Sequence, residues 1–216
     1  MKKTSNITAD FSMKIKQNLK QGTWLLALCA WGSCTPTALN PSDYQRYYAE
    51  KVPTLSDHKT SGKALMTLTL QTLNLLIIND LGSTITAAQY EESKNNFCEH
   101  LYFTFDVAAS TPLSTEAGKE LRSYFAHDRQ RQFVLVSQND TIPCTLYHPE
   151  LVNRGDKQVR INLVFPRPRV AGQACDVPLD EDLQVRFYDD KTHEYLSFLI
   201  KKENVNQLPK IKITTQ

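Results

Sequence analysis

Two cysteine–histidine pairs are the residues best suited to chemistry. Cys98 lies two residues before His100, and Cys144 lies four residues before His148. Thiolate and imidazole are ligands that zinc and copper prefer, and a Cys-x-His on a strand directs both side chains to one face. Neither spacing matches a familiar metal-binding pattern. We therefore expect no metal and no cofactor, with the thiols available for a disulfide and the histidines at the surface.

Three histidines define the alternative of an envelope hydrolase or metal-dependent enzyme: His100, His127 beside Asp128, and His148 near Glu150. Such a hydrolase needs a nucleophile, a base and an acid that orients the base. The sequence contains no Gly-x-Ser-x-Gly, and its few glycines are isolated from one another. A nucleophile elbow and a glycine-rich phosphate loop are therefore both missing, and we expect that the protein is not an enzyme.

The elements that would position these residues come after an export-type segment. Lys14, Lys16 and Lys20 precede the apolar sequence WLLALCAWGSC at residues 24–34. A basic flank followed by about ten apolar residues is typical of a secretory signal peptide, and such a run is about half the length that spans a bilayer. The alternative is an amphipathic or buried N-terminal helix.

The end of this segment resembles the lipidation motif of bacterial lipoproteins. Two small residues at 32–33 precede Cys34, although Trp31 stands where these proteins usually have leucine. Cys29 is the competing position, but a bulky leucine precedes it. The resemblance implies that Cys34 receives the lipid and that residues 1–33 are removed, so that the protein is anchored to a bacterial membrane and faces the periplasm or the exterior.

The chain then divides into three parts. Residues 1–33 form the signal peptide, with Met13 as an alternative start that gives a basic region of ordinary length. Residues 34–62 are polar, include three prolines, and are interpreted as the lipidated cysteine and a tether with a short helix at 44–50. Residues 63–216 have a length suited to a single β-rich domain.

Apolar alternation dominates this domain. It is typical of half-buried strands, and turn residues recur between the alternating runs. We therefore predict a mainly β fold: an antiparallel β-sandwich-like domain with one or two flanking helices. The strand patterns lie in residues 100–108, 131–148, 158–166, 182–200 and 210–213.

Three segments carry the remaining secondary-structure signals. Residues 84–97 and 114–126 each begin with serine or threonine cap residues and have helical spacing. Residues 65–78 alternate and then shift in phase, which predicts a bulge or a break into two strands. A buried helix is the alternative for this third segment.

Three cysteines follow the proposed anchor. An oxidising envelope permits one disulfide among Cys98, Cys144 and Cys175. Spacing does not rank the three pairings, but Cys144 and Cys175 bracket the most strand-like region and are our candidate pair. The alternative is that all three are small buried apolar residues.

The charge balance and the loop composition limit the kinds of partner that the protein can bind. The chain has 25 basic and 23 acidic residues, and five of the lysines and one acid lie before Cys34, which leaves 20 basic and 22 acidic residues. This balance does not suit nucleic acid. Arg167 and Arg169 alternate with prolines and form a candidate protein-partner surface. We expect a binding or scaffolding subunit of an envelope or secretion assembly; a carrier of an apolar ligand, with an open cavity between the sheets, is a further alternative.

Overall fold

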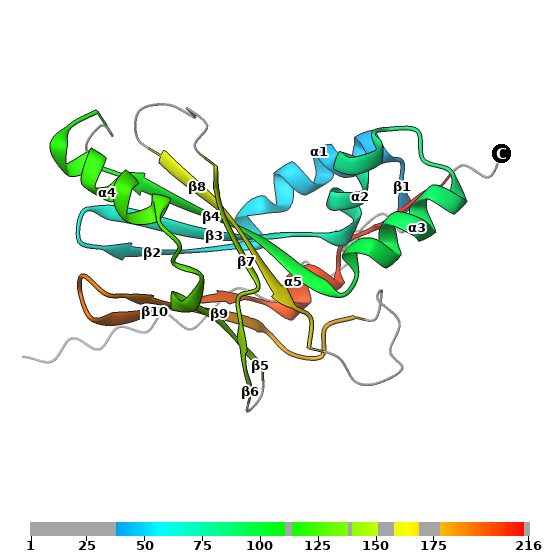
Figure 1. Cartoon of the computed structure of the whole chain (residues 1–216). Helices are drawn as coiled ribbons and strands as arrows, with labels where there is room; N and C mark the ends of the chain where they lie inside the picture. The colour runs from blue at the N-terminus through cyan, green and yellow to red at the C-terminus, as the bar shows by residue number, and fades with distance from the viewer. Residues whose placement is uncertain (1–37, 111–113, 138–139, 151–157, 169–177, 214–216) are drawn as a thin grey trace, which may run out of the picture. The chain divides into compact units, whose positions relative to one another are not determined.

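The protein was analysed as a computed structural model (Figure 1). The structure describes residues 38–110, 114–137, 140–150, 158–168 and 178–213. The predicted signal peptide lies outside these residues, and so do Cys34, Arg169 and Cys175. No helix in the described part of the chain is long and apolar enough to cross a membrane.

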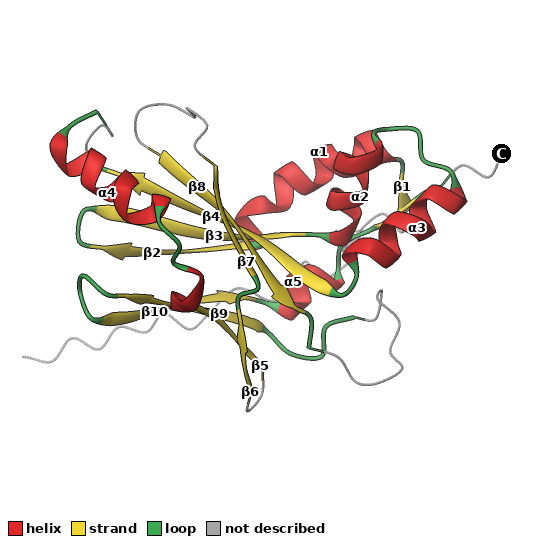
Figure 2. Cartoon of the chain, viewed as in Figure 1, coloured by secondary structure: helices red, strands yellow, loops and turns green. Residues whose placement is uncertain are grey.

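Two antiparallel sheets form the centre of the molecule (Figure 2). The prediction of a mainly β, antiparallel fold with flanking helices is confirmed. The five-stranded sheet has the order β2 (Ser56–Ser61), β3 (Ala64–Gln71), β4 (His100–Ala109), β8 (Gln158–Pro166) and β7 (Leu146–Glu150). The four-stranded sheet has the order β10 (Glu194–Ile200), β9 (Leu183–Asp189), β5 (Phe133–Ser137) and β6 (Asp140–Pro143).

The described residues form more helices than the one or two expected. They are α1 (Pro41–Lys51), α2 (Leu73–Leu81), α3 (Ala87–Phe97), α4 (Glu116–Ala126) and α5 (Lys202–Asn206), with 3₁₀ turns η1 (Val52–Thr54) and η2 (Gln130–Gln132).

Two short strands, β1 (Ala38–Leu39) and β11 (Lys210–Ile211), pair in parallel near the helices, so the C-terminal strand already has a partner in its own chain.

Side-chain caps explain where the predicted helices begin. Thr86 accepts a hydrogen bond from the Gln89 backbone N–H, and the Gln89 side chain accepts one from the Thr86 backbone N–H, which together form a capping box. The helix α3 therefore starts later than the expected cap at residues 83–84. Thr115 caps α4 by accepting from the Gly118 backbone N–H, within the predicted segment.

The phase shift in residues 65–78 marks a change from strand to helix. The strand β3 ends at Gln71, and the Thr72 side chain caps α2 by accepting from the Leu75 backbone N–H. The predicted bulge or second strand is therefore wrong. The buried-helix alternative is correct for the second half of this segment, where Ile77 and Ile78 are buried.

The predicted tether is wrong for the described part of residues 34–62. The helix α1 buries Tyr44 and Tyr48, and β2 pairs with β3 along its full length. The Tyr48 hydroxyl donates to the Leu70 carbonyl at 2.6 Å. Residues that were expected to hold the domain away from the membrane therefore belong to the domain itself.

The space between the two sheets is filled with aromatic rings. The Phe105 ring centroid lies 5.1 Å from that of Phe133, 5.6 Å from those of Phe187 and Phe198, and 6.1 Å from that of Phe125. A second hydrophobic cluster lies among α1, α2, α3 and the C-terminal segment. The alternative of an apolar-ligand carrier, with its cavity between the sheets, would need the place that the rings of the first cluster occupy.

Candidate binding sites

The structure places the three histidines of the enzyme alternative on separate elements. His100 begins β4 and packs edge-on against Tyr102, whereas His148 is exposed in β7. His127 follows α4, and its Nδ1 lies 2.6 Å from the Ser123 carbonyl oxygen. Among the residues that the structure describes, no group of three histidine, cysteine or acidic side chains is placed to hold a metal. The three histidines therefore do not converge on one site.

The predicted cysteine pairing is wrong. Cys144 is a free, buried thiol, and its Sγ donates to the Leu146 carbonyl at 2.9 Å. Burial raises the pKa of the Cys144 thiol to about 11, so the group remains protonated and unreactive at neutral pH. Cys98, at the end of α3, is the disulfide-bonded cysteine instead.

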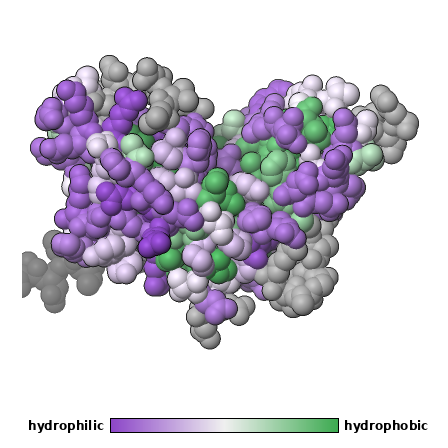
Figure 3. All heavy atoms as spheres, in the orientation of Figure 1, coloured by the Kyte–Doolittle hydropathy of each residue, from purple (hydrophilic) through white to green (hydrophobic). Residues whose placement is uncertain are grey.

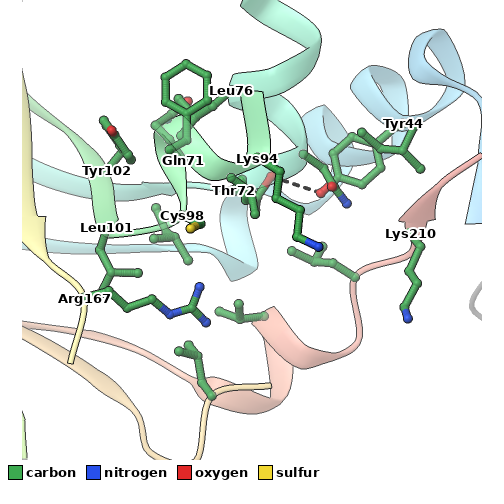
Figure 4. Close-up of a pocket in the computed structure, with 18 of the residues that line it drawn as sticks. Tyr44, Gln71, Thr72, Leu76, Lys94, Cys98, Leu101, Tyr102, Arg167 and Lys210 are labelled. Carbon is green, nitrogen blue, oxygen red and sulfur yellow. Dashed lines mark hydrogen bonds between the residues drawn. The ribbon is translucent and has the colours of Figure 1, made fainter. Parts of the chain in front are cut away.

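A cavity of about 420 Å³ lies where the helices meet the ends of the five-stranded sheet (Figure 4). Its walls come from α2 and α3, from the first residues of β4, from the segment after β8, and from α5 and the residues that follow it. Both His100 and Arg167 line it, so the structure brings together two residues that the sequence assigned to different functions. The Arg167 backbone N–H donates to the Glu99 carbonyl at 2.9 Å, which fixes this arginine beside the start of β4.

Two cations reach the cavity from different elements. Figure 4 shows the Lys94 ammonium, from α3, and the Arg167 guanidinium, after β8, directed into the same space. The Lys94 side chain is only 16% exposed, and its Nζ lies 3.6 Å from a carboxylate oxygen of Glu91, which is 60% exposed. An ion pair to so well solvated a carboxylate contributes little to stability. Lys210 adds a third cation to the lining.

Apolar side chains form much of the remaining wall. Asn206 holds two wall segments together, because its side chain accepts from the Leu179 backbone N–H and donates to the Leu179 carbonyl, each at 2.8 Å. In the space-filling view, apolar residues gather beside the helices, whereas the surface around α4 is mainly hydrophilic (Figure 3). The apolar wall residues from the sheet and the C-terminal half of the chain include Leu101, Leu179, Val205 and Leu208.

Tyr44 closes the cavity on the side of α1. Its hydroxyl lies 3.0 Å from the Thr72 hydroxyl, in the interaction drawn as a dashed line in Figure 4. Burial raises the pKa of Tyr44 to about 12, and this effect outweighs the opposite effect of the hydrogen bond from Thr72. The phenol is therefore neutral at physiological pH and adds no negative charge beside Lys94 and Arg167.

The outer face of the four-stranded sheet is a second candidate binding surface. The rings of Tyr188 and Tyr195 are paired across β9 and β10 with centroids 4.9 Å apart, and Tyr195 is 69% exposed. In Figure 1, no labelled helix lies over the side of the four-stranded sheet that faces away from the five-stranded sheet. We call this surface the aromatic face and define it by Val134, Arg186, Tyr188, Tyr195 and Leu199.

The alternation of β9 could have identified the aromatic face from the sequence. Leu183, Val185 and Phe187 point inward and are buried, so the residues between them must point outward.

The partner surface that the sequence predicted, at Arg167 and Arg169, lies elsewhere: Arg167 lines the cavity, and Arg169 lies outside the described residues. That prediction remains untested.

Comparisons with known proteins add little about function. No family model matches the chain, and no curated protein matches it. Among solved structures, the chain is similar to a novel protein of unknown function from Burkholderia pseudomallei K96243, with a TM-score of 0.38 and 10% identity over 79% of this chain and 94% of that one.

Proposed function

We propose that the protein is an extracytoplasmic lipoprotein, anchored through Cys34, that acts as a binding or scaffolding subunit of an envelope assembly. The aromatic face is the observation that supports this proposal. Tyrosine and arginine are enriched in protein interfaces and supply most of their binding energy. Here Tyr188, Tyr195 and Arg186 lie on one sheet face that no described helix covers (Figure 1), and Tyr195 is 69% exposed.

Lipid anchoring and partner binding support each other in this proposal. A protein held by acyl chains at Cys34 stays at the membrane without a transmembrane helix, and a flat sheet face then gives a partner an orientation to the membrane. The rigid sandwich behind the face would present Tyr195 without reorganisation, which lowers the cost of binding.

Site-specific photocrosslinking in native membranes tests the partner. A photoreactive phenylalanine replaces Tyr195, and a matched probe replaces Leu146, which is 49% exposed on the other sheet. We expect the Tyr195 probe, but not the Leu146 probe, to give one reproducible adduct with an envelope protein. The substitution Arg186→Glu, without the probe, should weaken copurification of the same protein. Equal labelling from both positions would contradict a partner at the aromatic face.

Mass spectrometry of the N-terminal peptide tests the anchor separately. We expect a peptide that starts at Cys34 and carries acyl chains, and we expect Cys34→Ser to release the protein from the membrane fraction. A protein that retains residues 1–33 unmodified in the cytoplasm would contradict the proposed location, whatever the crosslinking shows.

A further inference from the structure

We propose that the aromatic face binds a protein segment that presents one carboxylate among apolar side chains. The inference rests on the proposed function for the presence of a partner, and it adds the chemistry by which that partner is recognised. The cation that receives the carboxylate is Arg186, in the middle row of the face. The side chains that receive the apolar neighbours of the carboxylate are Tyr188, Tyr195 and Leu199.

Arg186 is the single charged side chain that alternates outward along the described strands of the four-stranded sheet. The inward residues of β9 are buried, and the strand register fixes which residues of β10, β5 and β6 share the outer side with Arg186. Arg129 and Arg160 each form an ion pair with an aspartate at 2.7 Å. In the described part of the chain, no acid pairs with Arg186 in this way. Its side chain is exposed, so an acid from a partner can reach it.

The neighbours of Arg186 are neutral. Across the strands, Arg186 lies beside Ser197 of β10 and Val134 of β5. Along β9, Gln184 lies two residues away, and its side-chain amide donates to the Ser197 hydroxyl at 2.6 Å. These neighbours supply no negative charge to the guanidinium. Because a guanidinium offers two parallel N–H donors that match the two oxygens of a carboxylate, the partner group that suits it best is a carboxylate.

Aromatic and apolar side chains flank Arg186 in both directions along the strands. The rings of Tyr188 and Tyr195 pair on one side of it, with centroids 4.9 Å apart, and Leu199 is 38% exposed on the other side. Successive rows on one face of a sheet are two residues apart, which is roughly 7 Å. In an extended partner segment, the side chains two residues before and after the acid have the same spacing, so they would contact these flanking rows.

The flanking side chains explain why a segment is needed and a lone anion is not enough. An exposed ion pair contributes little to binding by itself, because water and salt screen it. A segment that covers Tyr195 and Leu199 also removes water from around Arg186, which strengthens the attraction between the guanidinium and the carboxylate. Tyr195 offers the most apolar area for this contact, since it is 69% exposed.

The charge of the aromatic face favours a protein over an anionic membrane. Recognition of an anionic lipid surface uses clusters of about four to eight lysines and arginines. The outward positions of the described sheet carry Arg186 alone. One arginine beside exposed tyrosines is instead typical of a protein interface.

Three matched peptides test the carboxylate on the full-length protein, which is held in neutral phosphatidylcholine nanodiscs. Each capped peptide has a phenylalanine two residues before and a leucine two residues after a central glutamate, glutamine or lysine, with serine elsewhere. Binding is measured from the fluorine NMR signal of a fluorinated tyrosine incorporated at Tyr195. We expect the glutamate peptide to half-saturate the signal at about a tenfold lower concentration than the glutamine peptide, and the lysine peptide to bind more weakly still. Equal half-saturation by the glutamate and glutamine peptides, or no binding of the glutamate peptide, would overturn the proposal.

Two further samples test the apolar neighbours and the choice of a protein partner. A glutamate peptide with serine in place of the phenylalanine and the leucine keeps the charge without the apolar side chains. Phosphatidylglycerol placed in the nanodiscs supplies an anionic lipid surface without a peptide. We expect neither sample to move the Tyr195 signal as the first glutamate peptide does. An equal shift from the serine-flanked peptide would overturn the apolar neighbours, and one from phosphatidylglycerol would overturn the protein segment.

Charge reversal tests the assignment of the carboxylate to Arg186. Arg186→Glu should invert the preference, so that the lysine peptide binds more tightly than the glutamate peptide. The matched variant Arg122→Glu makes the same change in net charge at an exposed position of α4 and should keep the order of the wild type. A retained preference of Arg186→Glu for the glutamate peptide would overturn the role of Arg186.

Photocrosslinking at Tyr195 keeps this test separate from that of the proposed function. An envelope adduct at Tyr195 without any preference among the three peptides would overturn the carboxylate and leave the assembly role in place. A preference for the glutamate peptide without an envelope adduct would support the carboxylate site and contradict the assembly role.

Discussion

The two hydrophobic clusters are built from different side chains. Between the sheets, phenylalanine rings contact one another directly, and the Phe133 and Phe187 rings stack with centroids 4.6 Å apart. Among the helices, the largest buried side chain is a tyrosine, Tyr44, and both it and Tyr48 use their hydroxyls in hydrogen bonds. The sandwich is thus centred on phenylalanine rings, with hydrogen-bonded hydroxyls of Tyr124 and Tyr147 at its margin, whereas the helical cluster is built around two hydrogen-bonded tyrosines.

This difference explains where the two candidate binding surfaces lie. The centre of the sandwich is closely packed, and its candidate binding surface is the aromatic face on its outside. The helical cluster must satisfy the Tyr44 and Tyr48 hydroxyls, and it meets the sheet through loops and helix ends instead of a continuous layer. A cavity that carries the Lys94 and Arg167 charges forms at that junction.

The largest expected effect comes from breaking the sandwich cluster. Phe105→Ala removes a fully buried ring that contacts four others, and we expect the free energy of unfolding to fall by about 3–5 kcal/mol. Denaturant unfolding of the full-length protein measures the change. Leu65→Ala, at a position 43% exposed on β3, should cost about 0.5 kcal/mol or less. Similar losses for the two variants would show that the aromatic cluster is not the main source of stability.

Reduction of the Cys98 disulfide should have the next largest effect, on the helical side of the comparison. Our proposal places a lipid on Cys34, and Cys144 is free, so we expect Cys175 to be the partner of Cys98. Reduction or Cys98→Ser should lower the free energy of unfolding by about 2–4 kcal/mol, and hydrogen exchange should accelerate in α3, because Cys98 directly follows that helix and lines the cavity.

Peptide mapping without reduction checks this pairing. We expect alkylation of Cys144 only after unfolding, because its thiol is buried and its pKa is raised to about 11 by that burial. The variant Cys144→Ala should leave the disulfide-linked peptide unchanged. A linked peptide that contains Cys98 and Cys144 would contradict both the free thiol and the expected partner.

Local patterns predicted the sandwich well because its strands follow a period of two. The inward residues Val159, Ile161 and Leu163 of β8 are all buried, as their alternation predicts. The helix α1 was only partly predicted from the sequence, because the polar, proline-containing composition around it suggested a tether. The spacing of Tyr44 and Tyr48, one helical turn apart, was the signal that this segment packs on the domain.

The cavity could not be predicted because its residues come from distant parts of the chain. Lys94 has the sequence context of an ordinary charge on a helix, and Arg167 that of a loop arginine between prolines. Only the antiparallel pairing of His100 with Pro166 brings the start of β4 beside the end of β8 and therefore places Arg167 near α3. Long-range strand pairing of this kind leaves no local pattern in the sequence.

Removal of one tyrosine hydroxyl should have a smaller effect that is confined to the helical cluster. Tyr48→Phe deletes the hydrogen bond to the Leu70 carbonyl and should cost about 1 kcal/mol. Hydrogen exchange should accelerate in α1 and α2 and stay unchanged in β5 and β9. The neighbouring Tyr47→Phe, at a less buried position on α1, is the control. Uniform acceleration through both clusters would show that they unfold as one unit.

The smallest expected effect concerns the edge that joins the two sheets. Asp57 on β2 accepts a hydrogen bond from the Leu199 backbone N–H of β10 at 2.9 Å and pairs with Lys59 at 3.2 Å. Partial burial raises the pKa of Asp57, but the hydrogen bonds from the Leu199 N–H and from Lys59 together outweigh it, so the pKa lies below its ordinary value.

Acid should therefore weaken the contact between β2 and β10 at this edge. Because the pKa of Asp57 is lowered on folding, its stabilising effect is fully present above the unfolded pKa of about 3.9 and is lost as the pH falls through the folded value. We expect Asp57→Asn to flatten the fall in unfolding free energy below about pH 4 and to speed hydrogen exchange at Leu199 at neutral pH. Asp140→Asn, at an exposed position that begins β6, is the control. If Asp57→Asn left both the acid slope and the Leu199 exchange rate as they are in the wild type, the two sheets would be held together by their aromatic core alone, without help from this edge.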